Sequence, residues 1–283
     1  KDVVRFGVLP VVDTLPLLVG QETGTFSDQG IDLEIVSFQS ALERDAALQA
    51  GKLDGYFGDI LNSLLLIQSG QQVKILTTAF HTHPDHRMFG IASAPESGIT
   101  SMQALKGKDI AISRATIIEY VLDALLRSLE RPTDYVTKQE IKKMPIRLQM
   151  LLSGQMSAAL LPEPLLTLAE SKGAHVIADD RRLDTCLTIL AMDMTRIGGE
   201  SDLPERFVKA YGAAVARINR NPEAFKDLMI ARTRFPMPVK DLYTVPVFPE
   251  TGPPAEKDIT ATQDWLVQNG LLEEKIPYEQ VVF

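Results

Sequence analysis

Cysteine, long apolar runs and an excess of positive charge are what this sequence of 283 residues lacks. Its single cysteine, Cys186, excludes an internal disulfide, and its apolar neighbours in CLTILAM predict a buried structural thiol rather than a nucleophile. No apolar run approaches the roughly 18 residues of a membrane-spanning helix. The net charge of −8 argues against a nucleic-acid partner, because nucleic-acid binding requires basic stripes.

What remains is the composition of an ordinary globular protein, with 45% hydrophobic and 23% charged residues. The length suits one large domain or two ordinary ones, with enough chain for a real core. The first residue is Lys1 rather than Met. An exported protein, processed from a longer precursor, therefore stays open as an origin, and a lipid-anchored precursor is one form of it.

An internal repeat organises the sequence. Residues 44–59 read RDAALQAGKLDGYFGD, and residues 147–162 read RLQMLLSGQMSAALLP. Both copies run from an arginine through a short apolar helix to a glycine, Gly51 or Gly154, and then into a short apolar strand. Two copies are too few for a solenoid, which needs several repeats. They predict two units of similar build, each ending a strand at a ligand-facing edge.

The first half alternates strands with helices of about ten residues, which predicts a parallel sheet between helical layers. Asp13 or Thr14 is expected to cap the first helix, which Gly24 closes. Ser40 to Glu43 matches a capping box, and Asp59 or Asn62 is expected to start the helix after the third strand. The expected strands are residues 3–9, 31–38, 54–58 and 73–80.

The segment HTHPDHR at residues 81–87 gathers three of the four histidines, His81, His83 and His86. Imidazoles at this spacing can share a metal ion. The alternative is a polar crossover loop that lines a ligand site, with His81 or Arg87 in contact with the solute. One flexible segment seldom supplies three tetrahedral ligands, and no HExxH motif is present, so we expect no metal.

The second half repeats the same pattern from a strand at residues 88–94. Ser-Arg-Ala-Thr at residues 113–116 lies between a strand and a helix whose TIIE matches a capping box. Ser113 and Thr116 either cap that helix or, with Arg114, help its N–H groups to bind an anion. Glu163, between two prolines, should lie at a strand end. Further strands are expected at 175–178 and 186–193, and helices at 203–220, 222–232 and 256–269.

The ordered set of motifs resembles the type II periplasmic binding proteins of ABC importers. It is most similar to their nitrate, sulfonate, taurine and thiamine-pyrimidine-synthase-like group. The resemblance covers essentially the whole chain. It rests on GVLP, GTFSDQGIDLEIVSF, SALERDAALQAGKLDG, VKILTTAF, SGITSMQALKGKDIAISRATIIEYVLDALL and LQMLLSGQMSAALLPEP.

The resemblance implies a two-lobed α/β fold with three-layer αβα lobes, two hinge crossovers and a solute held in a central cleft. Lobe 1 would comprise residues 1–87 and 195–283, with the C-terminal helices packed back on it, and lobe 2 residues 88–194. The ligand corners of the family fall on strand ends and helix starts of this sequence. Adding His81 and Arg87, the expected ligand-binding residues are Pro10, Val11, Asp13, Thr14, Gln39, Ser40, Gly58, Asp59, Ile60, His81, Arg87, Ser113, Arg114, Thr116 and Glu163.

The function that the resemblance implies is capture of a small organic solute for an ABC permease, without catalysis or a cofactor. Three carboxylates at the expected corners, Asp13, Asp59 and Glu163, favour a cationic or nitrogen-containing solute over a bare sulfonate or nitrate. A sulfonate or taurine-type solute and a thiamine-precursor-like solute both stay open. We expect a periplasmic or extracytoplasmic monomer. The alternative is an enzyme of the same fold, related to thiamine-pyrimidine synthesis and metal-dependent through His81, His83 and His86.

Overall fold

The computed structural model of the chain describes residues 1–198 and 201–283 and separates into two compact units. The first unit comprises Lys1–His81, Thr185–Phe235 and Val245–Phe283, and the second comprises Thr82–Asp184 and Pro236–Thr244. These boundaries differ from those we expected, 87/88 and 194/195. The difference at the second crossover arises because the strand at Cys186–Asp193 is hydrogen-bonded into the sheet of the first unit.

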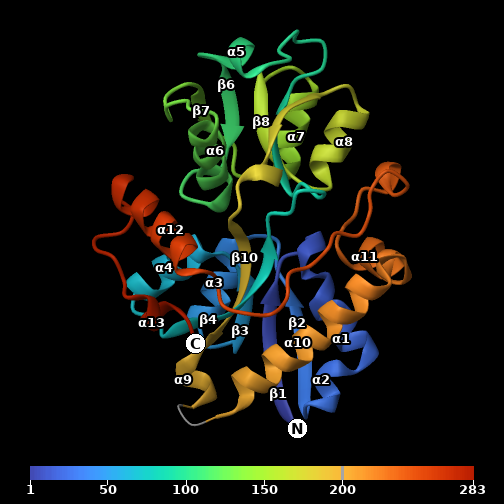
Figure 1. Ribbon diagram of the computed structural model, residues 1–283, viewed down its shortest axis with the longest axis vertical. Coiled ribbons are helices and arrows are strands. Elements are labelled where there is room, and N and C mark those ends of the chain that lie inside the picture. Colours follow the sequence, from blue (N-terminus) through green and yellow to red (C-terminus); the bar gives the residue numbers. More distant parts are fainter. Residues whose placement is uncertain (199–200) are drawn as a thin grey trace. The chain divides into compact units, whose positions relative to one another are not determined.

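The first unit is built on a five-stranded sheet in the order β2-β1-β3-β10-β4 (Figure 1). Adjacent strands β2, β1 and β3 are parallel, whereas β10 runs antiparallel to both β3 and β4. The four strands of the first half therefore share one direction, as expected, and β10 runs opposite to them between β3 and β4. The bounds are β1 (Asp2–Val8), β2 (Ile31–Ser37), β3 (Gly55–Gly58), β4 (Val73–His81) and β10 (Cys186–Asp193).

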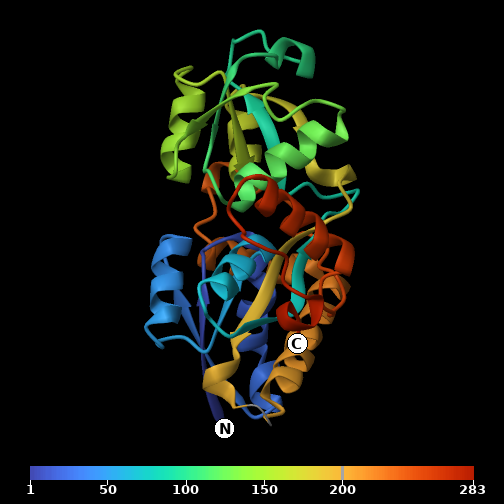
Figure 2. The ribbon, with the colours of Figure 1, turned by 90° about the vertical axis from the view of Figure 1, so that its left-hand side faces the viewer.

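Helices pack against this sheet in pairs that are distant in sequence. Helix α10 packs on α1 and α2, and its Phe207 stacks on Phe6 of β1. Helix α12 packs on α4. The C-terminal segment, red in Figures 1 and 2, thus belongs to the first unit. The helices are α1 (Leu15–Thr23), α2 (Thr25–Asp28), α3 (Ala41–Gln49), α4 (Ile60–Gln68), α9 (Met194–Ile197), α10 (Leu203–Arg220), α11 (Lys226–Arg232), α12 (Glu256–Gln268) and α13 (Tyr278–Val281).

The second unit has a sheet of the same kind, in the order β7-β6-β8-β5-β9 (Figure 1). Strands β7, β6 and β8 are parallel, and β5 runs antiparallel to β8 and β9, so the expected parallel order is wrong for one strand. The bounds are β5 (Phe89–Ser93), β6 (Asp109–Ile112), β7 (Thr137–Glu140), β8 (Ala158–Pro162) and β9 (His175–Asp179).

Four helices accompany the second sheet: α5 (Met102–Leu105), α6 (Ile117–Ser128), α7 (Met144–Leu152) and α8 (Leu165–Ser171). A short 3-10 helix at Met237–Val239 packs on α8, although the chain before Pro236 and after Thr244 belongs to the first unit. Val239 of this segment is fully buried. We call residues Pro236–Thr244 the inserted segment.

The internal repeat corresponds to the same strand-and-helix unit in both sheets. The first copy forms α3 and β3, and the second forms α7 and β8. Gly51 and Gly154 follow the two helices with φ angles of +67° and +72°. This left-handed conformation favours glycine and explains why both copies have it there.

Within the described ranges, none of the helices combines the length and apolarity that crossing a membrane requires.

Candidate functional site

Most candidate residues lie where strands end, at one edge of each sheet. Parallel strands bring their carboxyl ends to a common edge, which is the usual ligand-binding edge of α/β sheets. In the first unit this edge carries Pro10, Val11, Asp13, Thr14, Gln39, Ser40, Gly58, Asp59, Ile60 and His81. In the second unit it carries Arg87, Ser113, Arg114, Thr116 and Glu163.

Asp13 follows β1 in a 3-10 helix and is 4% exposed. Of the two expected caps, Thr14 occupies the N-cap position of α1. Its hydroxyl makes no capping hydrogen bond and donates to the Val11 carbonyl. The Asp13 carboxylate instead accepts a 2.8 Å hydrogen bond from the Thr188 hydroxyl on β10. Burial raises the pKa of Asp13 to about 6, against the opposing effect of that hydrogen bond.

The hydroxyl of Tyr211, on α10, faces the same region. It is buried and has no hydrogen-bond partner in the described part of the chain. Burial raises the pKa of Tyr211, and the charge of Asp13 raises it further. Asp13 and Tyr211 were brought together by packing of α10, more than 190 residues later in the chain, which no local pattern could have indicated.

Asp59 follows β3 and caps α4, accepting a 2.7 Å hydrogen bond from the Asn62 backbone N–H, as expected. Burial raises the pKa of Asp59 to about 6, although the nearby Arg44 guanidinium lowers it. Arg44 is buried and pairs with Asp45 at 2.7 Å. The guanidinium is therefore committed to its own unit rather than to a ligand.

Gln39 and Ser40, which follow β2, are also engaged within the first unit. Ser40 accepts a hydrogen bond from the Glu43 N–H, as the capping box predicts, and Gln39 accepts one from Arg234. Both side chains lie at the edge that we expected.

The histidines do not gather into a metal centre. His81 ends β4 in the first unit, whereas His83 and His86 face each other in a turn of the second unit, with ring centroids 5.3 Å apart. Among residues 1–198 and 201–283, no three His, Cys, Asp or Glu side chains lie close enough to hold a metal ion.

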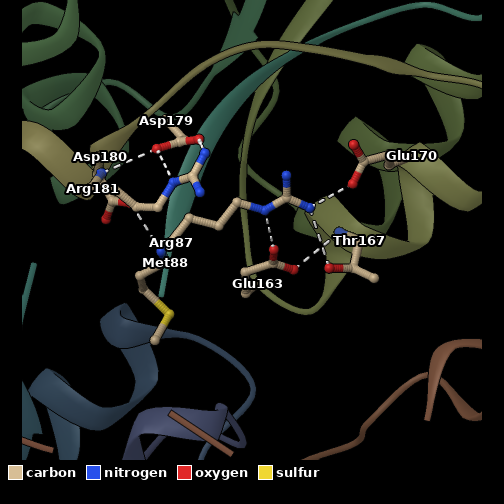
Figure 3. A network of polar contacts seen from close by, with 8 residues as sticks. All are labelled: Arg87, Met88, Glu163, Thr167, Glu170, Asp179, Asp180 and Arg181. Carbon is tan, nitrogen blue, oxygen red and sulfur yellow. Dashed lines mark hydrogen bonds and ion pairs between the residues drawn. The ribbon is translucent and has the colours of Figure 1, made fainter. Parts of the chain in front are cut away.

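Glu163 lies directly after β8, as the flanking prolines predict, and is 3% exposed. Its Oε1 accepts a 2.6 Å hydrogen bond from Arg87 Nε, and its Oε2 accepts one from the Thr167 N–H at 3.0 Å (Figure 3). Arg87 Nη2 also pairs with Glu170 on α8, at 2.7 Å. One guanidinium thus serves two carboxylates.

Three neighbours at this edge were not anticipated from the sequence. The Asp180 carboxyl is fully buried, accepts from the Met88 N–H at 2.9 Å, and has one oxygen without a partner in the described chain. Burial raises the pKa of Asp180 to about 7. Asp179 instead pairs with Arg181 at 2.7 Å, which opposes the effect of burial so that its pKa falls below the ordinary value (Figure 3).

The turn before α6 carries the other candidates of the second unit. Thr116 caps the helix, accepting from the Ile118 N–H at 3.2 Å, and Glu119 accepts from the Ala115 N–H at 2.8 Å. Thr116 is thus the helix cap that TIIE predicts, but the two bonds differ from those of a capping box, in which Thr116 and Glu119 would each accept from the backbone N–H of the other. Ser113 is half-buried at the end of β6 and contributes its carbonyl, which accepts from the Thr116 hydroxyl.

Arg114 turns back onto its own unit. Its Nη2 donates to the Lys138 carbonyl at 3.1 Å, and its backbone N–H donates to Glu140 at 2.8 Å. Its Nη1 lies 3.7 Å from a Glu119 oxygen. The backbone donors of Arg114 and Ala115 are therefore both occupied by carboxylates of the chain.

The model of one protein family, described as NMT1/THI5 like, matches residues 12–225. The chain belongs to the NMT1/THI5-like family. This NMT1/THI5-like protein is also 28% identical over 207 residues to a putative aliphatic sulfonates-binding protein of Bacillus subtilis (strain 168). The match covers 71% of the chain and 61% of that relative, so the chain spans less than two thirds of the relative's length.

Solved structures show the same fold at low sequence identity. The periplasmic aliphatic sulphonate binding protein SsuA of Escherichia coli superposes with a TM-score of 0.82 at 16% identity, covering 100% of this chain and 97% of that one. The desulfurization enzyme DSZB superposes with a TM-score of 0.72 at 18% identity, covering 100% and 96%. The NMT1/THI5-like protein thus has the two-lobed α/β fold of periplasmic binding proteins. This confirms both the resemblance and the fold class predicted from the sequence.

Proposed function

We propose that this chain is the extracytoplasmic solute-binding protein of an ABC importer and captures a small organic solute. The solute is of the sulfonate or taurine type or contains nitrogen, as a thiamine precursor does. The strand-end edges of the two units supply the contacts, from the residues expected to bind ligand. Binding is expected to draw the two units together, since a ligand that contacts both favours the closed state.

The single observation that carries this proposal is that both sheets present equivalent strand-end edges lined with polar side chains. Asp13 and Asp59 lie on one edge, and Glu163 with Arg87 on the other. Membership in the family and the sulfonate-binding relative support it.

An enzyme of the same fold is the alternative, and DSZB shows that the fold hosts one. The chemistry of this chain favours binding. Cys186 is its one cysteine, it is buried, and burial raises the pKa of its thiol, which opposes formation of a nucleophilic thiolate. His83 and His86 form a pair without a carboxylate-bearing third member in the described residues, so a metal-dependent reaction has no evident centre.

The partners that follow are the solute and a membrane-embedded ABC permease, to which the loaded protein docks as a monomer. Neither nucleic acid nor a cofactor takes part. The site of action is the periplasm or another extracytoplasmic compartment, where a lipid anchor on the precursor would keep the protein at the membrane.

A thermal-shift screen followed by calorimetry tests this function. The panel contains taurine, ethanesulfonate, nitrate, thiamine pyrimidines, polyamines and divalent metals. We expect one organic solute to raise the melting temperature, with saturable heat and no turnover, because a ligand that binds only the native state stabilises it by mass action. Conversion of the solute into a product would instead establish the enzyme, and absence of any saturable binding would reject the proposal.

A further inference from the structure

The polar network around Arg87 determines what kind of solute group the second unit can receive. Arg87 lies a few residues after the chain first passes between the units. Its guanidinium donates to Glu163 at the end of β8 and to Glu170 on α8 (Figure 3). The two ion-pair distances are 2.6 and 2.7 Å, and Nη2 also lies 3.4 Å from the Thr167 hydroxyl. The guanidinium therefore has its Nε and Nη2 donors committed to the chain itself.

The charges in this cluster do not balance. One arginine faces two carboxylates, and the burial of Glu163, with 2% of its side chain exposed, keeps one of them away from solvent screening. The neighbouring Arg181 forms an ion pair with Asp179 at 2.7 Å. The Arg114 side chain donates to the Lys138 carbonyl and lies near Glu119. Arg87 and Arg181 are thus paired with carboxylates of the chain, whereas Arg114 lies 3.7 Å from Glu119, which also pairs with Lys138.

We propose that Glu170 is a specificity-determining residue that holds Arg87 as an internal counter-ion and prevents it from receiving an anionic head group. This inference rests on the proposed solute-binding function and narrows its substrate class. The solute presents a cationic or uncharged nitrogen-bearing group to the second unit, as an amine or an amino-substituted heterocycle does. A free sulfonate is not held at Arg87.

The roles of the two glutamates differ in a way that makes the inference testable. Glu163 is buried and accepts from a backbone N–H as well as from Arg87, so its loss would disturb the fold. Glu170 is half exposed, and within the described residues Arg87 is its one ion-pair partner, so it can be changed with little structural cost. Glu170→Gln keeps the shape of the side chain, removes its charge and releases half of the guanidinium.

The experiment follows the side-chain Nε–H signal of Arg87 by nitrogen-edited NMR during titration with methanesulfonate. Arg87→Lys assigns the signal by its disappearance. In the unaltered chain we expect the signal to stay in place through tens of millimolar methanesulfonate. In Glu170→Gln it should move saturably, with an affinity roughly two- to fivefold above the wild-type limit, the range for a half-exposed charge. Asp134→Asn, the same charge change at an exposed site of the second unit, should behave as wild type.

Two results would overturn the inference. One is a saturable shift in the unaltered chain with the same affinity as in Glu170→Gln, since Arg87 would then already accept anions. The other is an unmoved signal in both, since the released guanidinium would then be no anion receptor. Neither result touches the proposed function, which fails only if the solute panel yields no saturable binding.

Discussion

Arg44 and Arg147 stand 103 residues apart and make equivalent hydrogen bonds. Arg44 Nη1 donates to the carbonyl of Phe57, and Arg147 Nη1 to that of Leu160, which lies 103 residues after Phe57. Both side chains are buried, at 2% and 0% exposure. The repeat in the sequence therefore corresponds to one hydrogen-bonded arrangement that occurs once in each unit. In it, a buried arginine on a helix donates to a carbonyl of the strand that follows.

Replacing Arg147 by methionine tests what this arrangement contributes. Arg147 also donates to the Ile141 carbonyl at 2.9 Å, so its loss removes a hydrogen bond from each of the two carbonyls, Leu160 and Ile141. We expect Arg147→Met to lower the free energy of unfolding by about 2–4 kcal/mol, measured by urea denaturation. Arg127→Met, at an exposed position of α6, serves as the control. Equal midpoints for the two variants would show that the arginine has no such structural role.

Asp13 should make stability depend on pH in a defined direction. Its folded pKa of about 6 lies above the ordinary aspartate value of 3.8, so the folded state holds the proton more tightly than the unfolded chain. The stabilising contribution is complete below pH 3.8 and is lost as the pH rises through about 6. The free energy of unfolding of Asp13→Asn should therefore rise relative to wild type by about 3 kcal/mol between pH 3.5 and pH 7 (~2 pKa units).

Urea denaturation at a series of pH values measures that difference. The exposed Asp32→Asn provides the matched control and should track wild type throughout. If the difference in the free energy of unfolding between wild type and Asp13→Asn does not change across this pH range, Asp13 is solvated in the folded protein.

Arg87 and Glu163 should be energetically coupled. Arg87→Met leaves the buried Glu163 carboxylate without its cation, which we expect to cost about 3–5 kcal/mol of unfolding free energy. In the double variant with Glu163→Gln, part of that cost should be recovered, giving a coupling of about 2 kcal/mol in a double-mutant cycle. Glu170→Gln, which removes the exposed partner of the same guanidinium, should cost less than about 1 kcal/mol. Additive single effects would argue against the pairing.

Cys186 should be inert in the native protein. It is 5% exposed and burial raises the pKa of its thiol, so we expect maleimide labelling at pH 7.5 to be at least about a hundredfold slower than that of a free thiol. Labelling should become fast in urea. Rapid labelling of the native chain, blocked by a bound solute, would instead place the thiol within reach of the ligand and revive the enzymatic alternative.

Local sequence signals predicted most elements well. Ser40 with Glu43 and Thr116 with Glu119 marked two helix starts because a capping box depends only on neighbours. Strand β7 was missed because its TKQE is polar and mostly exposed at a sheet edge, and helix α8 because it follows Pro164 directly. The antiparallel course of β5 and β10 was not readable, since both are buried along their whole length and show no alternation.

The candidate site was predictable in position and much less so in its contacts. Residues at strand ends, such as Asp59 and Glu163, were found because the order of strands and helices locates those ends. Their partners depend on long-range packing: Thr188 meets Asp13 from 175 residues away, and Glu170 meets Arg87 from 83 residues away. Such pairs determine whether a charged side chain is free to bind a ligand, and no spacing in the sequence encodes them.

The inserted segment, Pro236–Thr244, has a consequence for dissecting the molecule. Because the chain passes between the units at four points, neither unit is a continuous stretch of sequence. A polypeptide ending at Asp184 would leave the surface of α8 on which Met237–Val239 packs without its cover. The second unit should therefore be obtainable in isolation only as a split protein, with residues 82–184 reassembled with a synthetic peptide of residues 236–244, or as a fusion that rejoins the two.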